Sequence, residues 1–196
     1  DVTVRGYNFE GLHLPLLGKH QALNCATALC AIRCLQEQGL AIRDNDVKKG
    51  VRNVQWPGRF HIVKRKPLII IDGAHNADGV RVLCDNLRDY VHDRKIHVIF
   101  SAFLDKDIIR MVRLLSSVTD RVSLISMHTK RLQDIRYIKK VWMRYLPLSN
   151  ITVASDMHHI IKPIMEQDKT DDVHVVCGSL YLAGEVFSEL GIKPFP

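Results

Sequence analysis

The second part of the chain alternates short apolar runs with amphipathic segments. A run such as residues 96–100, IHVIF, is rich in β-branched side chains, which is typical of a buried strand. A segment such as residues 79–91 repeats apolar residues every three or four positions, which predicts a helix. Strands are expected at residues 60–65, 67–72, 96–100, 120–126, 151–154 and 173–179, and helices at residues 79–91, 106–118, 135–146, 158–167 and 180–190. This order predicts an α/β fold with a mostly parallel sheet flanked by helices.

The first 53 residues follow a different pattern. Residues 21–35 are apolar on nearly every side of a helix, so this helix is expected to be deeply buried. A strand is predicted before it, at residues 12–20, and a short helix after it, at residues 42–54. These elements are too few for an independent core. We therefore expect residues 1–53 to be part of one domain and residues 54–196 to form a complete second one.

Composition excludes disorder and narrows the kinds of partner. The chain has 196 residues, of which 46% are hydrophobic, and a net charge of +7. A positive charge suits nucleic acid, a phosphorylated cofactor or a polyanionic substrate, and does not choose among them. There is no apolar run of about 18 residues, so no membrane partner is expected. Cys25, Cys30 and Cys34 point in different directions on the predicted helix, and we interpret them as small buried side chains in a reducing cytoplasm.

Polar residues come directly after the apolar run at residues 68–71. Asp72, His75 and Asn76 lie within five residues, between this predicted strand and the next helix. In an open parallel sheet, ligands bind beyond the carboxyl ends of the strands, where an acidic side chain can accept both ribose hydroxyls of a nucleotide. The same spacing suits an ordinary turn with Asn76 or Asp78 as the helix cap. Both interpretations remain open from the spacing.

Arg59 follows Pro57 and Gly58 in a predicted tight turn. A guanidinium in this position can donate two hydrogen bonds to phosphate oxygens, or it can be a solvated charge at a strand edge. Arg59 and the basic residues 64–66 form a weak candidate for a nucleic-acid patch, because Phe60 is the aromatic residue nearby and alternation divides the charges between two faces. Nucleic acid is therefore not expected as a partner.

Several catalytic motifs are absent from the sequence. A phosphate loop needs glycine, four residues and then Gly-Lys-Ser/Thr, whereas Gly18 and Lys19 are followed by His20 and preceded by His13 at the required distance. The adjacent pair at residues 158–159 lies on a predicted helix, where neighbouring side chains diverge by about 100°, so these histidines are not expected to share a metal ion. No metal site is predicted within this chain.

Five motifs in a fixed order resemble one family. They are LPLLGKHQALNCATA, WPGRF, IIIDGAHNADG, FSAFLDKD and CGSLYLAGEV, and together they extend from Leu14 to Val186. They are similar to the carboxyl-terminal part of folylpolyglutamate synthase, often bifunctional as dihydrofolate synthase, in the Mur ligase superfamily. The resemblance implies that residues 1–53 are the end of the central ATPase domain and that residues 54–196 are the Rossmann-like carboxyl-terminal domain. A different Mur-type amino-acid ligase and a noncatalytic nucleotide- or nucleic-acid-binding module are the alternatives.

The resemblance also implies an activity. In this family the γ-phosphate of ATP activates a folate glutamate carboxylate as an acyl phosphate, which the amine of L-glutamate attacks. Folate or dihydropteroate and L-glutamate are then the substrates, and ATP and Mg²⁺ the cofactors, with the metal ligands in the missing amino-terminal ATPase domain. A cytoplasmic enzyme that is a monomer in its full-length form is expected. The phosphate loop is absent here, so the chain is expected to be a fragment that is inactive alone.

Site residues are carried over from the same motifs. Asn24 resembles the family's asparagine near the adenine, Arg59 the arginine that reaches the ATP phosphates, and Asp72 the acid that binds the nucleotide. His75 resembles the neighbouring histidine needed for activity, and we assign it to positioning or domain closure. Lys106 and Ser179 are weaker candidates for binding anionic substrate groups.

One position of the loop departs from the family. The usual proline after the DGAHN motif is replaced by Ala77, so the loop is expected to be less stiff, although Asp72, His75 and Asn76 keep their positions.

Overall fold

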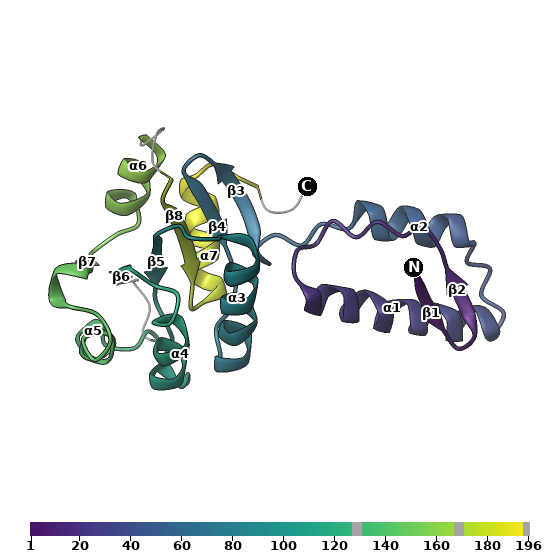
Figure 1. Cartoon of the computed structure of the whole chain (residues 1–196), viewed down its shortest axis with the longest axis horizontal. Coiled ribbons are helices and arrows are strands. Elements are labelled where there is room, and N and C mark those ends of the chain that lie inside the picture. The colour runs from purple at the N-terminus through teal and green to yellow at the C-terminus, as the bar shows by residue number, and fades with distance from the viewer. Residues whose placement is uncertain (127–130, 167–170, 194–196) are drawn as a thin grey trace. The chain divides into compact units, whose positions relative to one another are not determined.

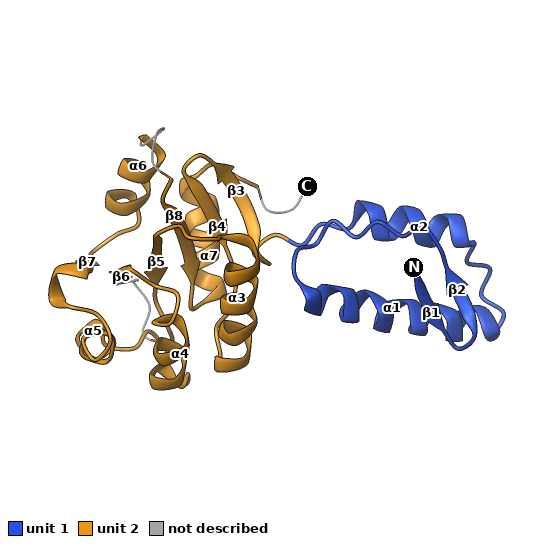
Figure 2. Cartoon of the chain, in the orientation of Figure 1, with its two compact units in different colours: residues 1–56 blue, residues 57–196 orange. Residues whose placement is uncertain are grey.

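The chain divides into two compact units in a computed structural model that describes residues 1–126, 131–166 and 171–193. Unit 1 comprises residues 1–56 and unit 2 residues 57–196 (Figure 2). The division lies three residues beyond the expected boundary, at the predicted Pro57 turn. None of the described helices is both long and apolar enough to cross a membrane.

Unit 2 is built on a sheet whose six described strands have the order β3-β4-β8-β5-β6-β7 (Figure 1). Its strands are β3 (His61–Arg65), β4 (Leu68–Ile71), β5 (Ile96–Phe100), β6 (Arg121–Ile125), β7 (Ile151–Ala154) and β8 (Val173–Cys177). The pair β3 and β4 is antiparallel, and the other neighbouring pairs are parallel. The predicted mostly parallel α/β sheet is confirmed.

Helices cover both faces of this sheet. They are α3 (Ala77–Tyr90), α4 (Ile108–Leu115), α5 (Ile135–Trp142), α6 (His158–Glu166) and α7 (Leu180–Glu189). Buried residues of α3, α4 and α5 form one core cluster with Val98 and Phe100 of β5. Buried residues of α6 and α7 form a second cluster with Ile99 of β5. Successive side chains of a strand point to opposite faces, so the two clusters lie on opposite sides of the sheet.

The order of the strands indicates that a ligand would bind at the carboxyl ends of β4, β8 and β5. Strand β8 lies between β4 and β5 and is parallel to both. The helices after β4 and β5 cover one face, whereas α7, which follows β8, covers the other. The loops after these strands therefore lead to opposite faces, which is the topological switch point where open α/β sheets bind ligands.

Unit 1 differs from its predicted structure in two places. It contains β1 (Val2–Val4), β2 (Tyr7–Phe9), α1 (Lys19–Glu37) and α2 (Asp44–Asn53). The strand predicted at residues 12–20 is wrong: residues 12–18 form no strand, and α1 begins at Lys19. The paired strands β1 and β2 were not predicted.

The expected deep burial of α1 is also wrong. Within the described residues, Gln21 and Leu29 are the buried side chains of this helix, while Leu23 is 72% exposed. Cys25, Cys30 and Cys34 are only partly buried, contrary to the prediction. The described part of unit 1 has a small core, whose buried residues are Val4, Phe9, Leu29 and Val47, and Cys25, Cys30 and Ile32 of α1 are partly buried against it.

Candidate functional site

The loop between β4 and α3 carries the polar residues found in the sequence. Asp72 is buried, with 8% of its surface exposed. Its Oδ1 accepts a hydrogen bond from the backbone N–H of Ala74, and its Oδ2 accepts one from the backbone N–H of Phe60, both at 2.8 Å. The Asp72 carboxylate therefore joins this loop to the turn that precedes β3.

A backbone hydrogen bond joins the same two segments. The N–H of Gly73 donates to the carbonyl oxygen of Gly58 at 2.6 Å. Gly58 and Phe60 have positive φ angles, of 78° and 42°, and the exposed Arg59 lies between them. The structure thus brings the backbone that carries Arg59 beside the loop that carries Asp72.

Two glycines allow the loops after β4, β8 and β5 to approach closely. A Cβ atom on Gly73 would lie 2.3 Å from Cδ2 of Leu180, and one on Gly178 would lie 2.3 Å from the carbonyl oxygen of Ser101. The N–H of Gly178 also donates to the carbonyl oxygen of Ala74 at 2.8 Å. Sequence reasoning missed these packing roles; the signal was a glycine directly after the strand in the CGS motif and one residue later in the DGAHN motif.

The ring of His75 is oriented by the loop itself. Its Nδ1 lies 2.8 Å from the carbonyl oxygen of Gly73. A carbonyl oxygen only accepts hydrogen bonds, so Nδ1 is the donor in this contact; in the neutral form of the ring, Nε2 then keeps the lone pair. This tautomer leaves Nε2 to accept a hydrogen bond. The assigned role of His75 in positioning or closure stays a prediction.

Asn76 is the cap of α3. Its Oδ1 accepts a hydrogen bond from the backbone N–H of Gly79 at 2.8 Å, and the helix begins at the next residue, Ala77. The side chain of Asp78 is 77% exposed and lies 3.9 Å from the guanidinium of Arg110. The open question about the cap is therefore answered in favour of Asn76.

Lys106 and Ser179 lie at the starts of two other helices. The Nζ atom of Lys106 is 2.6 Å from Oδ2 of Asp105. Ser179 is fully buried, and its hydroxyl oxygen accepts a hydrogen bond from the N–H of Leu182 at 2.9 Å as the cap of α7. Their suggested contacts with anionic substrate groups stay predictions.

Asn24 lies on α1 of unit 1. It is exposed, and its amide donates to Oε1 of Gln21 at 3.1 Å. Its suggested place near the adenine stays a prediction.

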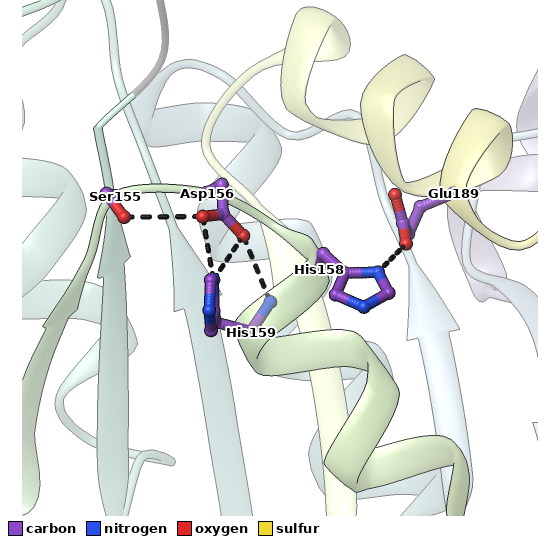
Figure 3. A network of polar contacts seen from close by, with 5 residues as sticks. All are labelled: Ser155, Asp156, His158, His159 and Glu189. Atoms are coloured by element: carbon purple, nitrogen blue, oxygen red, sulfur yellow. Dashed lines mark hydrogen bonds and ion pairs between the residues drawn. The ribbon is translucent and has the colours of Figure 1, made fainter.

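The two neighbouring histidines of α6 bind different carboxylates. Nδ1 of His158 lies 2.5 Å from Oε1 of Glu189 on α7, while Nδ1 of His159 lies 2.7 Å from both oxygens of Asp156 (Figure 3). The hydrogen bonds to Asp156 lower the pKa of that carboxyl group. Among the residues that the structure describes, no three His, Cys, Asp or Glu side chains are grouped to hold a metal ion.

A second group of histidines is buried in the sheet and was missed by sequence reasoning. His97 of β5 and His174 of β8 are 8% and 0% exposed, with their Nδ1 atoms 3.0 Å apart. Nε2 of His97 lies 2.8 Å from the hydroxyl of Ser123 on β6. Burial, with the nearby charge of Arg121, lowers the pKa of His97 to about 3 and that of His174 to about 4. Both rings are therefore neutral near pH 7.

Comparison with known proteins identifies the family of the chain. The family model described as Mur ligase, glutamate ligase domain, matches residues 58–180. The dihydrofolate synthase/folylpolyglutamate synthase of Bacillus subtilis is 27% identical over 183 residues, which cover 93% of this chain and 42% of that protein. The folylpolyglutamate synthase of Lacticaseibacillus casei is 28% identical, with 89% of this chain and 39% of that protein covered.

A solved structure extends the comparison to three dimensions. FolC of Escherichia coli in complex with ADP matches with a TM-score of 0.79 and 26% identity, and covers 93% of this chain and 41% of that one. The chain thus spans less than half the length of these relatives. The resemblance to the carboxyl-terminal part of folylpolyglutamate synthase is confirmed. The chain belongs to the Mur ligase family, and its residues 58–180 match the glutamate ligase domain of that family.

Proposed function

We propose that this chain is the carboxyl-terminal part of an ATP-dependent ligase that adds L-glutamate to the γ-carboxylate of a folate, and that it contributes to nucleotide binding. The observation that carries this proposal is the joining of the Arg59 turn to the Asp72 loop at the carboxyl end of β4. The relatives named above support the choice of substrate, because they are named for folylpolyglutamate synthesis. The ADP in the Escherichia coli relative supports the choice of nucleotide.

The residues have separate tasks in this proposal. Arg59 is exposed, and its guanidinium suits the paired oxygens of a phosphate group. Asn24 binds near the adenine, Asp72 belongs to the nucleotide site, and His75 accepts a hydrogen bond at Nε2 when the site closes. Lys106 and Ser179 bind anionic groups of the substrates.

In this proposal, phosphoryl transfer also needs a metal ion and a phosphate loop, which the residues named above do not supply. When bound, ATP supplies the phosphoryl group that activates the substrate carboxylate, and Mg²⁺ balances the charge of its phosphates. We expect an amino-terminal ATPase domain to hold that metal ion and to supply the phosphate loop, and this chain to be inactive without it. We also expect a cytoplasmic monomer that uses folate or dihydropteroate.

Replacing Arg59 tests this assignment. A charged hydrogen bond to a phosphate is worth roughly 1.5–3 kcal/mol, so Arg59→Ala should weaken binding of ADP by about 10- to 100-fold. The measurement is a titration of the 196-residue chain with ADP and Mg²⁺. Arg65→Ala is the matched control, because Arg65 is also exposed but lies at the far end of β3. Equal affinity of Arg59→Ala and the unmodified chain would contradict the assignment.

A further inference from the structure

The positive charge of the chain is concentrated in one stretch of unit 2. Residues 108–150 contain nine basic and two acidic residues, so this stretch carries as much net charge as the whole chain, which is +7. Both acidic side chains bind backbone N–H groups: Asp120 accepts from Ile96, and Asp134 accepts from Arg136 as the cap of α5. A surface with this excess of positive charge suits a partner with several negative charges.

The exposed side of α5 carries three of these cations in a row. Arg136, Lys140 and Arg144 follow one another at intervals of four residues, and a helix places such residues on one side, about 6 Å apart along its axis. Helix α5 ends at Trp142, but the N–H of Leu146 still donates to the carbonyl oxygen of Trp142 at 3.0 Å. The turn that carries Arg144 therefore continues the row, which we call the basic row of α5.

The basic row of α5 is open to solvent. Lys140 and Arg144 are exposed, and among the residues that the structure describes no side chain forms a hydrogen bond or an ion pair with either of them. The side chain of Arg136 is 89% exposed and lies 2.7 Å from Oδ2 of Asp134. An exposed ion pair of this kind contributes little to stability, so a carboxylate of a ligand can take the place of Asp134.

Helix α5 begins at the same end of the sheet as the candidate site. The segment before it pairs with the loop after β5: the N–H of Leu104 donates to the carbonyl oxygen of Arg131 at 2.9 Å, and the N–H of Gln133 donates to that of Ala102 at 3.0 Å. Three strand spacings separate β4 from β6, after which α5 follows, and they amount to about 14 Å. A ligand at the candidate site therefore needs an extension of about this length to reach the row.

We infer that the basic row of α5 binds the glutamate tail of the folate substrate, through the α-carboxylates of the glutamates that were added in earlier cycles. This inference rests on the proposed function, which supplies the substrate. Each γ-linked glutamate adds one α-carboxylate and lengthens the tail by up to about 6 Å, as its bond lengths require. This interval matches the spacing of the row, and a tail of about three or four glutamates spans the distance from the end of β4.

Nucleic acid is the other polyanion that this surface suits. Tyr137 and Tyr145 are 40% and 39% exposed beside the row, and aromatic rings among cations can stack on bases. The glutamate tail is favoured because the proposed reaction itself produces it, and because the row begins at the end of the sheet where that reaction is placed.

Reversing two charges of the row tests the inference. An N-acetylated pentamer of γ-linked L-glutamate is titrated at low salt into the 196-residue chain and into Lys140→Glu/Arg144→Glu. We expect the double variant to bind the pentamer at least about tenfold more weakly, because attraction is replaced by repulsion.

Lys48→Glu/Arg52→Glu is the matched control. It makes the same change of charge at an exposed lysine and arginine four residues apart on α2 of unit 1. Because exposed charges are screened over a short distance, the control should weaken binding less than about twofold. Equal losses in the two double variants would overturn the inference.

Backbone amide signals locate the bound pentamer. We expect shifts at residues 136–146, no shifts at residues 44–53, and an affinity that rises from the dimer of γ-linked glutamate to the pentamer as more carboxylates meet cations. An affinity that does not depend on length, or shifts that avoid residues 136–146, would overturn the inference.

Two further titrations separate the alternatives. A single-stranded oligothymidine of equal charge should bind more weakly than the pentamer, and tighter binding that is lost in Lys140→Glu/Arg144→Glu would assign the row to nucleic acid and overturn the inference. Normal binding of ADP without binding of the pentamer would overturn the inference alone. Binding of the pentamer at the row without binding of ADP would support the inference and count against the proposed nucleotide site.

Discussion

Replacement of Gly178 by alanine should destabilise the protein more than a methyl group added at any other residue near the carboxyl ends of β4, β5 and β8. The φ of Gly178 is +107°, and an added Cβ would lie 2.3 Å from the carbonyl oxygen of Ser101 and 2.8 Å from the ring of Phe100. Strain in the backbone and a clash with a backbone oxygen act together, so we expect Gly178→Ala to lower the free energy of unfolding by about 4 kcal/mol. Urea unfolding followed by tryptophan fluorescence measures this loss.

Gly184 provides the matched control in the helix that follows. It lies within α7, and an added Cβ would meet no atom within 4 Å. Alanine is the better residue in a helix, so Gly184→Ala should raise the free energy of unfolding by about 0.5–1 kcal/mol. Similar effects of the two alanines would contradict the close approach of the loops after β5 and β8.

The stability of the chain should fall steeply in mild acid because of His97 and His174. Their facing Nδ1 atoms need one donor and one acceptor, which a neutral pair provides and a protonated pair does not. Burial lowers both pKa values from the ordinary 6.5, to about 3 for His97 and about 4 for His174. Nearby Arg121 lowers both pKa values further, while Asp172 opposes the shift at His174.

Because both pKa values are lowered in the folded chain, the free energy of unfolding decreases as the pH falls. The unfolded chain takes up protons below about pH 6.5, and the folded chain does not do so until about pH 4 to 3. The stabilisation is therefore complete above pH 6.5 and is lost as the pH falls through this window. Each histidine contributes about 1.4 kcal/mol per pH unit, so the pair should lower the free energy of unfolding by about 5 kcal/mol between pH 6.5 and 4.5.

Urea unfolding at a series of pH values measures this slope. The double variant His97→Gln/His174→Gln should lose most of it, because neither amide titrates. His92→Gln, which replaces an exposed histidine, should keep it. A slope that is the same in the unmodified chain and the double variant would mean that the pair is not buried and neutral as described.

The strands of the sheet could be predicted because each one is marked by a short apolar run in the sequence. Strands β5 and β7 match their predicted limits, since each is a short β-branched run with clear ends. Helix ends were less accurate: α5 ends at Trp142, before its predicted end at residue 146. Turns continue after Trp142, where the N–H of Leu146 donates to the carbonyl oxygen of Trp142 at 3.0 Å, so the apolar pattern runs past the end of the helix and does not mark it.

The error at residues 12–20 has an identifiable cause. Leu12, Leu14 and Leu16 alternate as in a strand, but Pro15 has no N–H to donate and Gly18 has a φ of +107° at the start of α1. Strands β1 and β2 are three residues each, too short for a periodic signal. The turn between them, with positive φ angles at Arg5 and Gly6, was the feature that marked a hairpin.

The candidate site was only partly visible in the sequence. The loop after β4 was found because polar residues follow an apolar run, which is a local pattern. The hydrogen bond from the Phe60 N–H to the Asp72 carboxylate joins residues 12 apart, and the contact of His97 with His174 joins residues 77 apart. Such contacts depend on the order and register of the strands, which the pattern of one sequence does not contain.

The most direct test of the account is to map where ADP binds by nuclear magnetic resonance. Backbone amide signals of the 196-residue chain are recorded as ADP and Mg²⁺ are added. We predict the largest shifts at residues 58–60 and 73–76, with little change at residues 64–66 of the same strand region. Shifts that avoid the first two segments, or saturation without any change there, would contradict a nucleotide site built from the Arg59 turn and the Asp72 loop.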